Sequence, residues 1–175
     1  GQEYPFEEAP ADLLVHEQDC WRLHPGDSWH GFDDLKDNWC MLDPIKVSLL
    51  TPGMGDDGEL LDTGVPAELV AAYVGRFGIV PTRTTDYQVM FLFSIGITKG
   101  KWATLINTLL SFKRLYDENA RLEEALPELV AGHPERYSGL GLKDLGDEMF
   151  AFLKEYDPGS VLNAAYSTIP EPAMK

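Results

Sequence analysis

The fold is decided by residues 86–119, which begin Asp86-Tyr87-Gln88-Val89-Met90-Phe91-Leu92-Phe93-Ser94-Ile95-Gly96-Ile97-Thr98-Lys99-Gly100-Lys101-Trp102. The run from position 88 to 95 is almost entirely apolar and contains three strong strand formers, Val89, Phe91 and Phe93. It is too short for a buried helix, and glycines follow it at positions 96 and 100. The run therefore predicts a strand that is covered on both faces.

The spacing of the apolar residues changes after this strand. They recur at i, i+3, i+4, i+7 and i+8, at Trp102, Leu105, Ile106, Leu109 and Leu110. This is the stripe of an amphipathic helix. We therefore expect a strand, a glycine turn and a long helix that packs back onto the rest of the chain.

The residues before this unit predict a second strand and a second helix. Ile45, Val47 and Leu49 alternate with polar residues, as in a half-buried strand. Pro66 suits the first position of a helix and Gly78 suits its C-terminal cap. The expected apolar stripe of that helix is Ala67, Val70, Ala71, Val74 and Phe77.

A short strand at 79–80, ended by proline, and a polar connection over 82–86 should lead into the central strand. Two more helices are expected after it, at 122–130 and 142–156. The second should carry one apolar face, formed by Leu145, Met149, Phe152 and Leu153. The fold class predicted is α+β, with a small, mainly antiparallel or mixed sheet packed against helices.

The N-terminal part is irregular and rich in aromatic residues. Trp21, Trp29, Phe32 and Trp39 lie in a stretch with little periodicity. Side chains of this size favour burial, so we expect an ordered coil that packs against a larger body. The domain organisation predicted is an irregular lead-in over 1–43, a small α/β domain over 44–157 and a tail over 158–175.

The composition excludes several classes of function. The chain has 175 residues, 44% of them hydrophobic and 25% charged, as in an ordinary globular protein. A net charge of −15 argues against nucleic-acid binding and against an anionic membrane surface. No apolar run is long enough to span a bilayer and no signal peptide is visible, so a cytoplasmic protein with two reduced cysteines is expected.

Short chemical motifs give no complete active site. Residues 96–101 fail as a phosphate-binding loop, because three residues separate the glycines and Trp102 replaces the metal-binding hydroxyl. Cys20, His24, His30 and Cys40 have the side chains of a zinc site, but their spacing matches no standard zinc motif. Ser28, His30 and Asp34 could form a Ser-His-Asp triad, but the sequence has no Gly-x-Ser-x-Gly nucleophile elbow. The acidic loop at 56–62 lacks the EF-hand pattern and is interpreted as solvated surface.

A family resemblance rests on longer motifs. They are residues 29–32 (Trp-His-Gly-Phe), 43–54 (Asp-Pro-Ile-Lys-Val-Ser-Leu-Leu-Thr-Pro-Gly-Met), 64–67 (Gly-Val-Pro-Ala), 91–97 (Phe-Leu-Phe-Ser-Ile-Gly-Ile) and 112–114 (Phe-Lys-Arg). They resemble the bacterial ornithine, lysine and arginine decarboxylases, which are pyridoxal-phosphate enzymes of the aminotransferase-like fold. The resemblance covers residues 19–166. Residues 78–86 and 141–153 are similar to the biodegradative, acid-induced arginine-type members, since the lysine and ornithine types usually carry Val-Glu-Lys-Thr after Gly-Ile-Val.

The resemblance places the catalytic centre outside this chain. The family's cofactor-binding lysine lies in a Ser-x-His-Lys motif, and no lysine here follows a histidine. The chain would then be the small domain downstream of the cofactor domain, with no catalytic residue, no metal ligand and no bound pyridoxal phosphate of its own. The residues expected nearest the substrate are Thr82, at a position where lysine-type members place Glu, with Arg83, Asp86 and, more weakly, His30.

For the full-length enzyme the resemblance implies decarboxylation of arginine to agmatine and carbon dioxide in acid resistance. It also implies homodimers that assemble into pentamers of dimers. The isolated chain is expected to be inactive. Two alternatives stay open: part of a lysine or ornithine decarboxylase, and a non-catalytic interaction module with the same fold.

Overall fold

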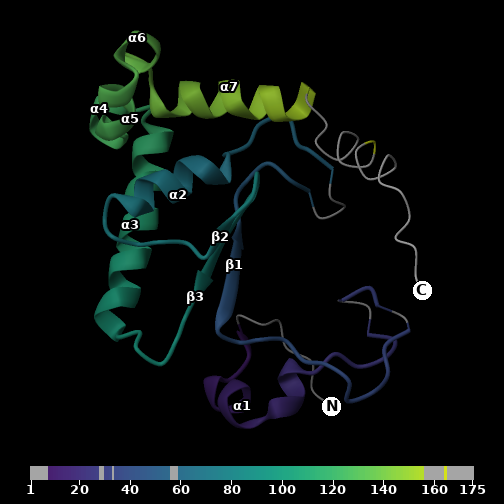
Figure 1. Ribbon diagram of the computed structural model, residues 1–175. Helices are drawn as coiled ribbons and strands as arrows, with labels where there is room; N and C mark the ends of the chain where they lie inside the picture. The colour runs from purple at the N-terminus through teal and green to yellow at the C-terminus, as the bar shows by residue number, and fades with distance from the viewer. Residues whose placement is uncertain (1–7, 28–29, 33, 56–58, 156–163, 165–175) are drawn as a thin grey trace, which may run out of the picture. The chain divides into compact units, whose positions relative to one another are not determined.

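A computed structural model describes residues 8–27, 30–32, 34–55, 59–155 and 164. The chain divides into two compact units, residues 1–46 and residues 47–175 (Figure 1).

The first unit is held by short backbone pairings. It contains the helix α1 (Ala11–His16) and the 3-10 turn η2 (Gln18–Trp21), followed by coil. An antiparallel bridge joins Arg22 to Met41, and the flanking amide of Leu42 donates to the carbonyl of Trp21 at 2.7 Å. The Trp21 indole donates to the carbonyl of Leu14 at 2.9 Å. The segment is therefore an ordered coil, as the sequence predicts.

Burial of the aromatic residues in this coil is not achieved within the chain. Trp21 is half-buried, but Phe32 and Trp39 are exposed, and Trp39 keeps 71% of its surface in solvent. Trp29 lies outside the described residues. Exposed apolar surface of this size on a coil is typical of a segment that another body covers.

The second unit is built on a three-stranded sheet in the order β1-β3-β2 (Figure 1). The strands are β1 (Lys46–Leu50), β2 (Arg83–Thr84) and β3 (Gln88–Leu92). β2 and β3 run antiparallel, with Arg83 opposite Met90 and Thr84 opposite Val89. The expected strand at 79–80 is absent, and the expected polar connection over 82–86 contains β2 instead. The prediction was wrong because a two-residue strand gives no measurable alternation.

The central strand β3 is buried on one face only. Val89 and Phe91 are buried in the core, whereas Leu92 is exposed and the strand ends there rather than at residue 95. α2 and α3 lie on the same side of the sheet in Figure 1. The prediction of a strand covered on both faces is therefore wrong for this chain.

The helix α2 (Ala67–Gly75) ends in a left-handed glycine, as the sequence predicts. Gly78 has φ +73°, its amide donates to Gly75 at 3.0 Å, and the Ile79 amide donates to Val74 at 3.3 Å. These two bonds are the pattern of a Schellman cap. The buried face differs from the expected stripe, because Leu69 and Tyr73 are buried while Phe77 is exposed.

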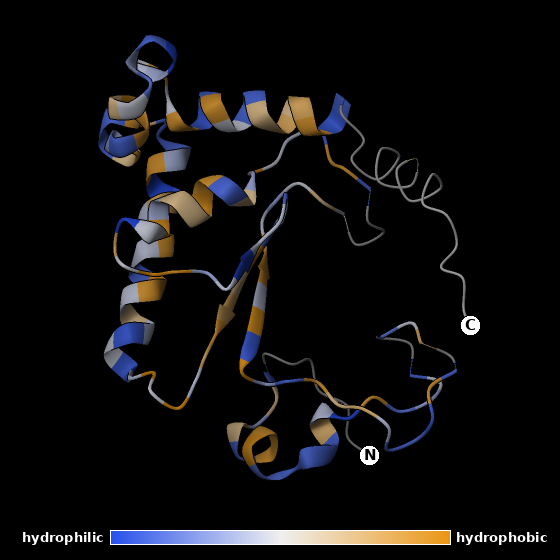
Figure 2. Cartoon of the chain, in the orientation of Figure 1, coloured by the Kyte–Doolittle hydropathy of each residue, from blue (hydrophilic) through white to orange (hydrophobic). Residues whose placement is uncertain are grey.

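The helix α3 (Lys99–Asp117) carries two apolar faces. Leu105, Phe112 and Leu115 are buried against the core. Leu109 also packs against the core, but three members of the expected stripe, Trp102, Ile106 and Leu110, are exposed by 41%, 50% and 60%, and we call these three the outer stripe. Figure 2 shows apolar residues on both sides of this helix. The helix itself is predicted correctly, but the single apolar stripe expected from the sequence covers two different faces of it.

Within residues 122–155 the chain forms four helices: α4 (Leu122–Ala125), α5 (Pro127–Gly132), α6 (Pro134–Tyr137) and α7 (Leu142–Glu155). The single helix expected at 122–130 is broken at Leu126, because the residue before a proline disfavours helical geometry. In α7, Leu145 is buried and Met149 packs against the core, as expected, but Phe152 is exposed and Phe150 is buried in its place.

One arginine joins α2 to this helical group. Arg76 donates through Nη1 to the carbonyl oxygens of Glu124, at 2.9 Å, and Ala125. These carbonyls belong to the last turn of α4, where backbone acceptors have no partner within the helix. The guanidinium group also lies over the rings of Tyr73 and Phe77.

Candidate functional site

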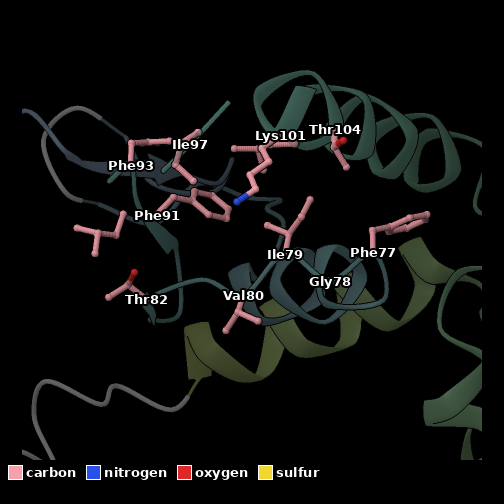
Figure 3. A pocket seen from close by; sticks show the side chains of 12 residues that line it. Phe77, Gly78, Ile79, Val80, Thr82, Phe91, Phe93, Ile97, Lys101 and Thr104 are labelled. Atoms are coloured by element: carbon pink, nitrogen blue, oxygen red, sulfur yellow. The ribbon is translucent and has the colours of Figure 1, made fainter. Parts of the chain in front are cut away.

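A cavity of about 410 Å³ lies where the end of α2, the strand β3 and the start of α3 meet (Figure 3). Its lining combines large apolar side chains with one ammonium group, two hydroxyl groups and exposed polar surface of the backbone. The lining residues are Phe77, Gly78, Ile79, Val80, Thr82, Phe91, Leu92, Phe93, Ile97, Lys101, Thr104 and Leu105.

One wall of the cavity depends on the glycine turn after α2. The positive φ of Gly78 reverses the chain, which then brings Ile79 and Val80 along the cavity. Val80 is 84% exposed and lies at the open side, whereas Ile79 packs against the core. A residue with a Cβ would be strained in this conformation. The turn therefore determines where the wall stands.

The opposite wall is aromatic. Phe91 is buried and its ring lies 6.5 Å from that of Phe93. The Phe93 ring stacks on Trp102, with centroids 4.0 Å apart and planes 1° from parallel. The stack joins the end of the sheet to the first turns of α3. Trp102 therefore packs directly behind the cavity wall.

Lys101 supplies the positive charge of the cavity. Thr98 is the N-terminal cap of α3, and its hydroxyl oxygen accepts from the Lys101 amide at 3.4 Å. The Lys101 Nζ donates to the carbonyl of Gly96 at 3.4 Å, and Figure 3 shows this nitrogen pointing between Phe91 and Ile79. The glycine-containing segment 96–101 therefore turns the chain and caps a helix.

Thr82 lines this cavity, and Arg83 does not. The Thr82 amide donates to the carbonyl of Met90 at 2.8 Å, which fixes the residue at the start of β2. Arg83 is the first residue of β2, and its side chain is exposed.

Asp86 lies at a different surface. Its carbonyl accepts from the Ala67 amide at 2.9 Å, at the N-terminus of α2. It lines a groove of about 580 Å³ that also contains Glu68 and Glu148. Burial, and secondarily the charge of Asp86, raise the pKa of the adjacent Tyr87.

His30 belongs to the first unit and is held in one tautomer. Its Nδ1 accepts from the amide of Phe32 at 3.0 Å, so Nε2 carries the proton and donates to the carbonyl of His24 at 2.8 Å. The structure therefore brings only Thr82, of the four expected substrate-side residues, to the cavity.

The other candidate motifs do not form a site among the described residues. Within the described ranges, no group of three or more His, Cys, Asp or Glu side chains is placed to hold a metal ion. Cys20 and Cys40 are free thiols, and His24 contacts Asp37 at 3.2 Å. Ser28 of the imagined triad and residues 56–58 of the acidic loop lie outside the described residues.

Sequence reasoning missed Lys101 and the aromatic wall as parts of one cavity. In the sequence, Lys101 is notable only as the lysine of a possible phosphate-binding loop, and Phe91 and Phe93 only as strand formers. No periodic signal connects the end of α2 to the start of α3, since more than twenty residues separate them. Only the packing of the two helices on one side of the sheet reveals the cavity.

Comparison with known proteins identifies the family. The profile described as "Orn/Lys/Arg decarboxylase, major domain" matches residues 6–101. The chain belongs to the Orn/Lys/Arg decarboxylase family. It is 64% identical over 170 residues to the biodegradative arginine decarboxylase of Escherichia coli K12, covering 97% of this chain and 22% of that protein. It is 43% identical over 155 residues to the lysine decarboxylase LdcA of Pseudomonas aeruginosa, covering 89% and 21%.

Solved structures of family members have the same fold. The constitutive lysine decarboxylase of E. coli superposes with a TM-score of 0.79 at 41% identity, over 91% of this chain and 22% of that one. Lysine decarboxylase A of P. aeruginosa gives a TM-score of 0.77 at 42% identity, over 90% and 21%. The expected α+β fold is confirmed. The chain spans about a fifth of the length of these relatives.

The cavity of this family member does not fit pyridoxal phosphate. Of the residues that the structure describes, Lys101 is the only lysine at the cavity and no carboxylate lines it to pair with a pyridine nitrogen. No lysine in the sequence follows a histidine. Separately, none of the described helices is long and apolar enough to cross a membrane.

Proposed function

We propose that this chain is part of a pyridoxal-phosphate-dependent arginine decarboxylase that converts arginine to agmatine and carbon dioxide. The observation that carries the proposal is the 64% identity to an arginine decarboxylase, against 43% and 41% for two lysine decarboxylases. A difference of this size, over most of the chain in each case, favours arginine as the substrate.

The cofactor, when bound in the full-length enzyme, withdraws electrons from the substrate carbon that loses carbon dioxide. The contribution of this chain is to substrate binding. Thr82 offers a neutral hydroxyl from the position just before β2, and Arg83, Asp86 and His30 are the further candidates. No catalytic role is assigned to this chain, and without the cofactor-binding lysine we propose that it is inactive by itself.

The acidic composition supports a role in acid resistance in the cytoplasm. Decarboxylation of arginine consumes one proton for each molecule of agmatine. A net charge of −15 on this chain falls in magnitude as its carboxylates protonate at low pH. Weaker repulsion would then favour association, which supports dimers that assemble into pentamers of dimers in the full-length enzyme.

The test is a substrate panel on the full-length enzyme. We expect kcat/KM to be highest for arginine, with lysine and ornithine far behind. The T82E substitution should lower kcat/KM for arginine and raise the relative rate with lysine, because the resemblance places Glu there in lysine-type members. T85E, three residues along and also near the surface, is the matched control. If the unchanged enzyme prefers lysine or ornithine, the proposal is wrong and the chain is part of a lysine or ornithine decarboxylase.

A non-catalytic interaction module is the second candidate. Its distinguishing observation lies in the reading frame before residue 1. A cofactor domain that ends in Ser-x-His-Lys there supports the decarboxylase, and a start codon supports the module. Agmatine produced by the purified 175-residue chain with added cofactor would contradict the proposed inactivity.

A further inference from the structure

Lys101 differs from most of the other lysines of the second unit. Three lysines of this unit form ion pairs with aspartates: Lys113 with Asp117, Lys143 with Asp147 and Lys154 with Asp62. In the first unit, Lys46 pairs with Asp43. Among the described residues, the Lys101 ammonium group donates a hydrogen bond to the backbone carbonyl of Gly96, at 3.4 Å. In a chain with net charge −15, an ammonium group that lies in a cavity without a carboxylate is unusual.

The surroundings of Lys101 favour an anion. No acidic side chain of the described residues lines the cavity, and eight of its lining residues are Phe, Ile, Leu or Val. Phe91 and Leu105 are buried. Lys101 itself is exposed, so its charge is partly screened by water, and the buried ring of Phe91 and the side chain of Leu105 limit that screening on one side only.

The two hydroxyl groups of the cavity differ in what they offer. The Thr104 hydroxyl donates to the carbonyl of Gly100 at 3.0 Å, one turn earlier in α3, and so has its donor committed. Thr82 adds a hydroxyl on the opposite wall. The charged and hydroxyl groups of the cavity are therefore one cation with a hydroxyl across from it, beside an aromatic and aliphatic wall.

We propose that this cavity binds a small amphipathic carboxylate. The carboxylate group of the ligand lies on the Lys101 ammonium group, and its hydrocarbon body lies against Phe91, Phe93 and Ile79. The volume of about 410 Å³ is within the range of roughly 300–1,000 Å³ that is typical of ligand pockets. An ammonium group beside Lys101 is disfavoured because the two charges repel. Thr82 lines this cavity and is also the proposed substrate contact, so a bound carboxylate and the substrate of the full-length enzyme would compete for it.

Octanoate is the probe, and 1-octanol and octylammonium are its neutral and cationic counterparts. Each is titrated into the 175-residue chain below its micellar concentration, with binding followed by calorimetry and by tryptophan fluorescence. Trp102 stacks on the wall residue Phe93, so octanoate binding should change the emission. The change should disappear in W102F although the heat of binding remains. Octanoate should bind roughly tenfold more tightly than 1-octanol, since a charge-assisted bond is lost in the alcohol.

Two variants test the role of the charge. K101M should weaken octanoate binding by roughly tenfold and leave 1-octanol binding unchanged. K99M is the matched control, because Lys99 is an exposed lysine of the same helix turn that does not line the cavity. V80D places a carboxylate at the exposed side of the cavity, where folding should tolerate it, and should also weaken octanoate binding.

The proposal is overturned if octanoate gives neither heat nor a change in emission. It is equally overturned if octanoate and 1-octanol bind alike, or if K101M binds octanoate as well as K99M does. Circular dichroism of each variant separates loss of binding from loss of folding. If K101M does not fold, the comparison of V80D with the unchanged chain decides the question.

Discussion

The side-chain oxygen of Asn119 accepts a hydrogen bond from the backbone amide of Lys143 at 2.9 Å, although 24 residues separate the two. The same oxygen accepts from the amide of Asp144 at 3.2 Å. Asn119 follows α3 with φ +48°, and the two amides belong to the first turn of α7. The residue that ends one long helix therefore caps the beginning of another.

Removal of this cap should destabilise the chain. N119A loses both hydrogen bonds and places alanine in a left-handed conformation, so we expect the free energy of unfolding to fall by about 2 kcal/mol. N119D keeps the acceptor oxygen and adds negative charge at a helix N-terminus, and it should stay close to the unchanged chain. Urea unfolding measures both. Equal destabilisation of N119A and N119D would contradict the capping role.

The packing of Phe150 should make Gly64 intolerant of a side chain. A Cβ at Gly64 would lie 2.7 Å from the Cα of Gly53 and closer still to the Phe150 ring. We expect G64A to lower the free energy of unfolding by about 1–3 kcal/mol, or more, because the contact includes backbone. G75A is the control: nothing lies within 4 Å of a Cβ there, in α2, and alanine should stabilise the helix by about 0.5–1 kcal/mol. A neutral effect of G64A in urea unfolding would show that the loop moves freely.

Tyr116 should make stability depend on pH in alkaline solution. Burial, and then the charge of Asp147, raise the pKa of Tyr116 from 10.0 to about 12 in the folded chain. A group with a raised folded pKa stabilises the chain fully below its unfolded pKa, and that contribution is lost as pH rises from about 10 through about 12. Urea midpoints measured from pH 8 to 11.5 should fall, and they should fall less in Y116F.

At neutral pH the Y116F variant reports a different interaction. The Tyr116 hydroxyl donates to the carbonyl of Gly64 at 3.2 Å, in a buried position. Its loss should cost about 1 kcal/mol of the free energy of unfolding. Identical pH profiles for Y116F and the unchanged chain would assign the alkaline loss to other groups.

The outer stripe of α3 should cause the isolated chain to self-associate. Trp102, Ile106 and Leu110 are three exposed apolar side chains at helical spacing, and such contiguous surface favours association. L110E should increase the monomer fraction in sedimentation velocity while unfolding within about 0.5 kcal/mol of the unchanged chain. N107E, which adds the same charge to another exposed position of the helix, should leave association unchanged. Equal effects of the two substitutions would attribute the change to net charge alone.

The sequence predicts helices well where periodicity is long. α2, α3 and α7 were expected within a few residues of their bounds, and Gly78 was expected to end α2. Prediction from the sequence fails where a single residue decides whether a helix or strand forms. Pro127 breaks a helix that the apolar spacing would continue, and β2 is too short to show alternation.

Burial was harder to predict than secondary structure. Leu105 and Ile106 are adjacent in the expected stripe, yet one faces the core and the other faces solvent. The stripe spans two faces because α3 has apolar residues around more than half of its circumference. A sequence shows that these residues are apolar but not which neighbour covers each face. For the same reason Thr82 could be named from a family resemblance, whereas the charge opposite it, Lys101, required the fold.

The contact of Arg76 with the last carbonyls of α4 links the local stability of two helices. Opening the end of α2 withdraws the guanidinium donor, and the carbonyls of Glu124 and Ala125 then lose a partner. The two segments should therefore open together as one cooperative unit rather than fray independently. In amide hydrogen exchange, the last turn of α2 and the turn at α4 would then share one opening free energy, even though some fifty residues of chain separate them.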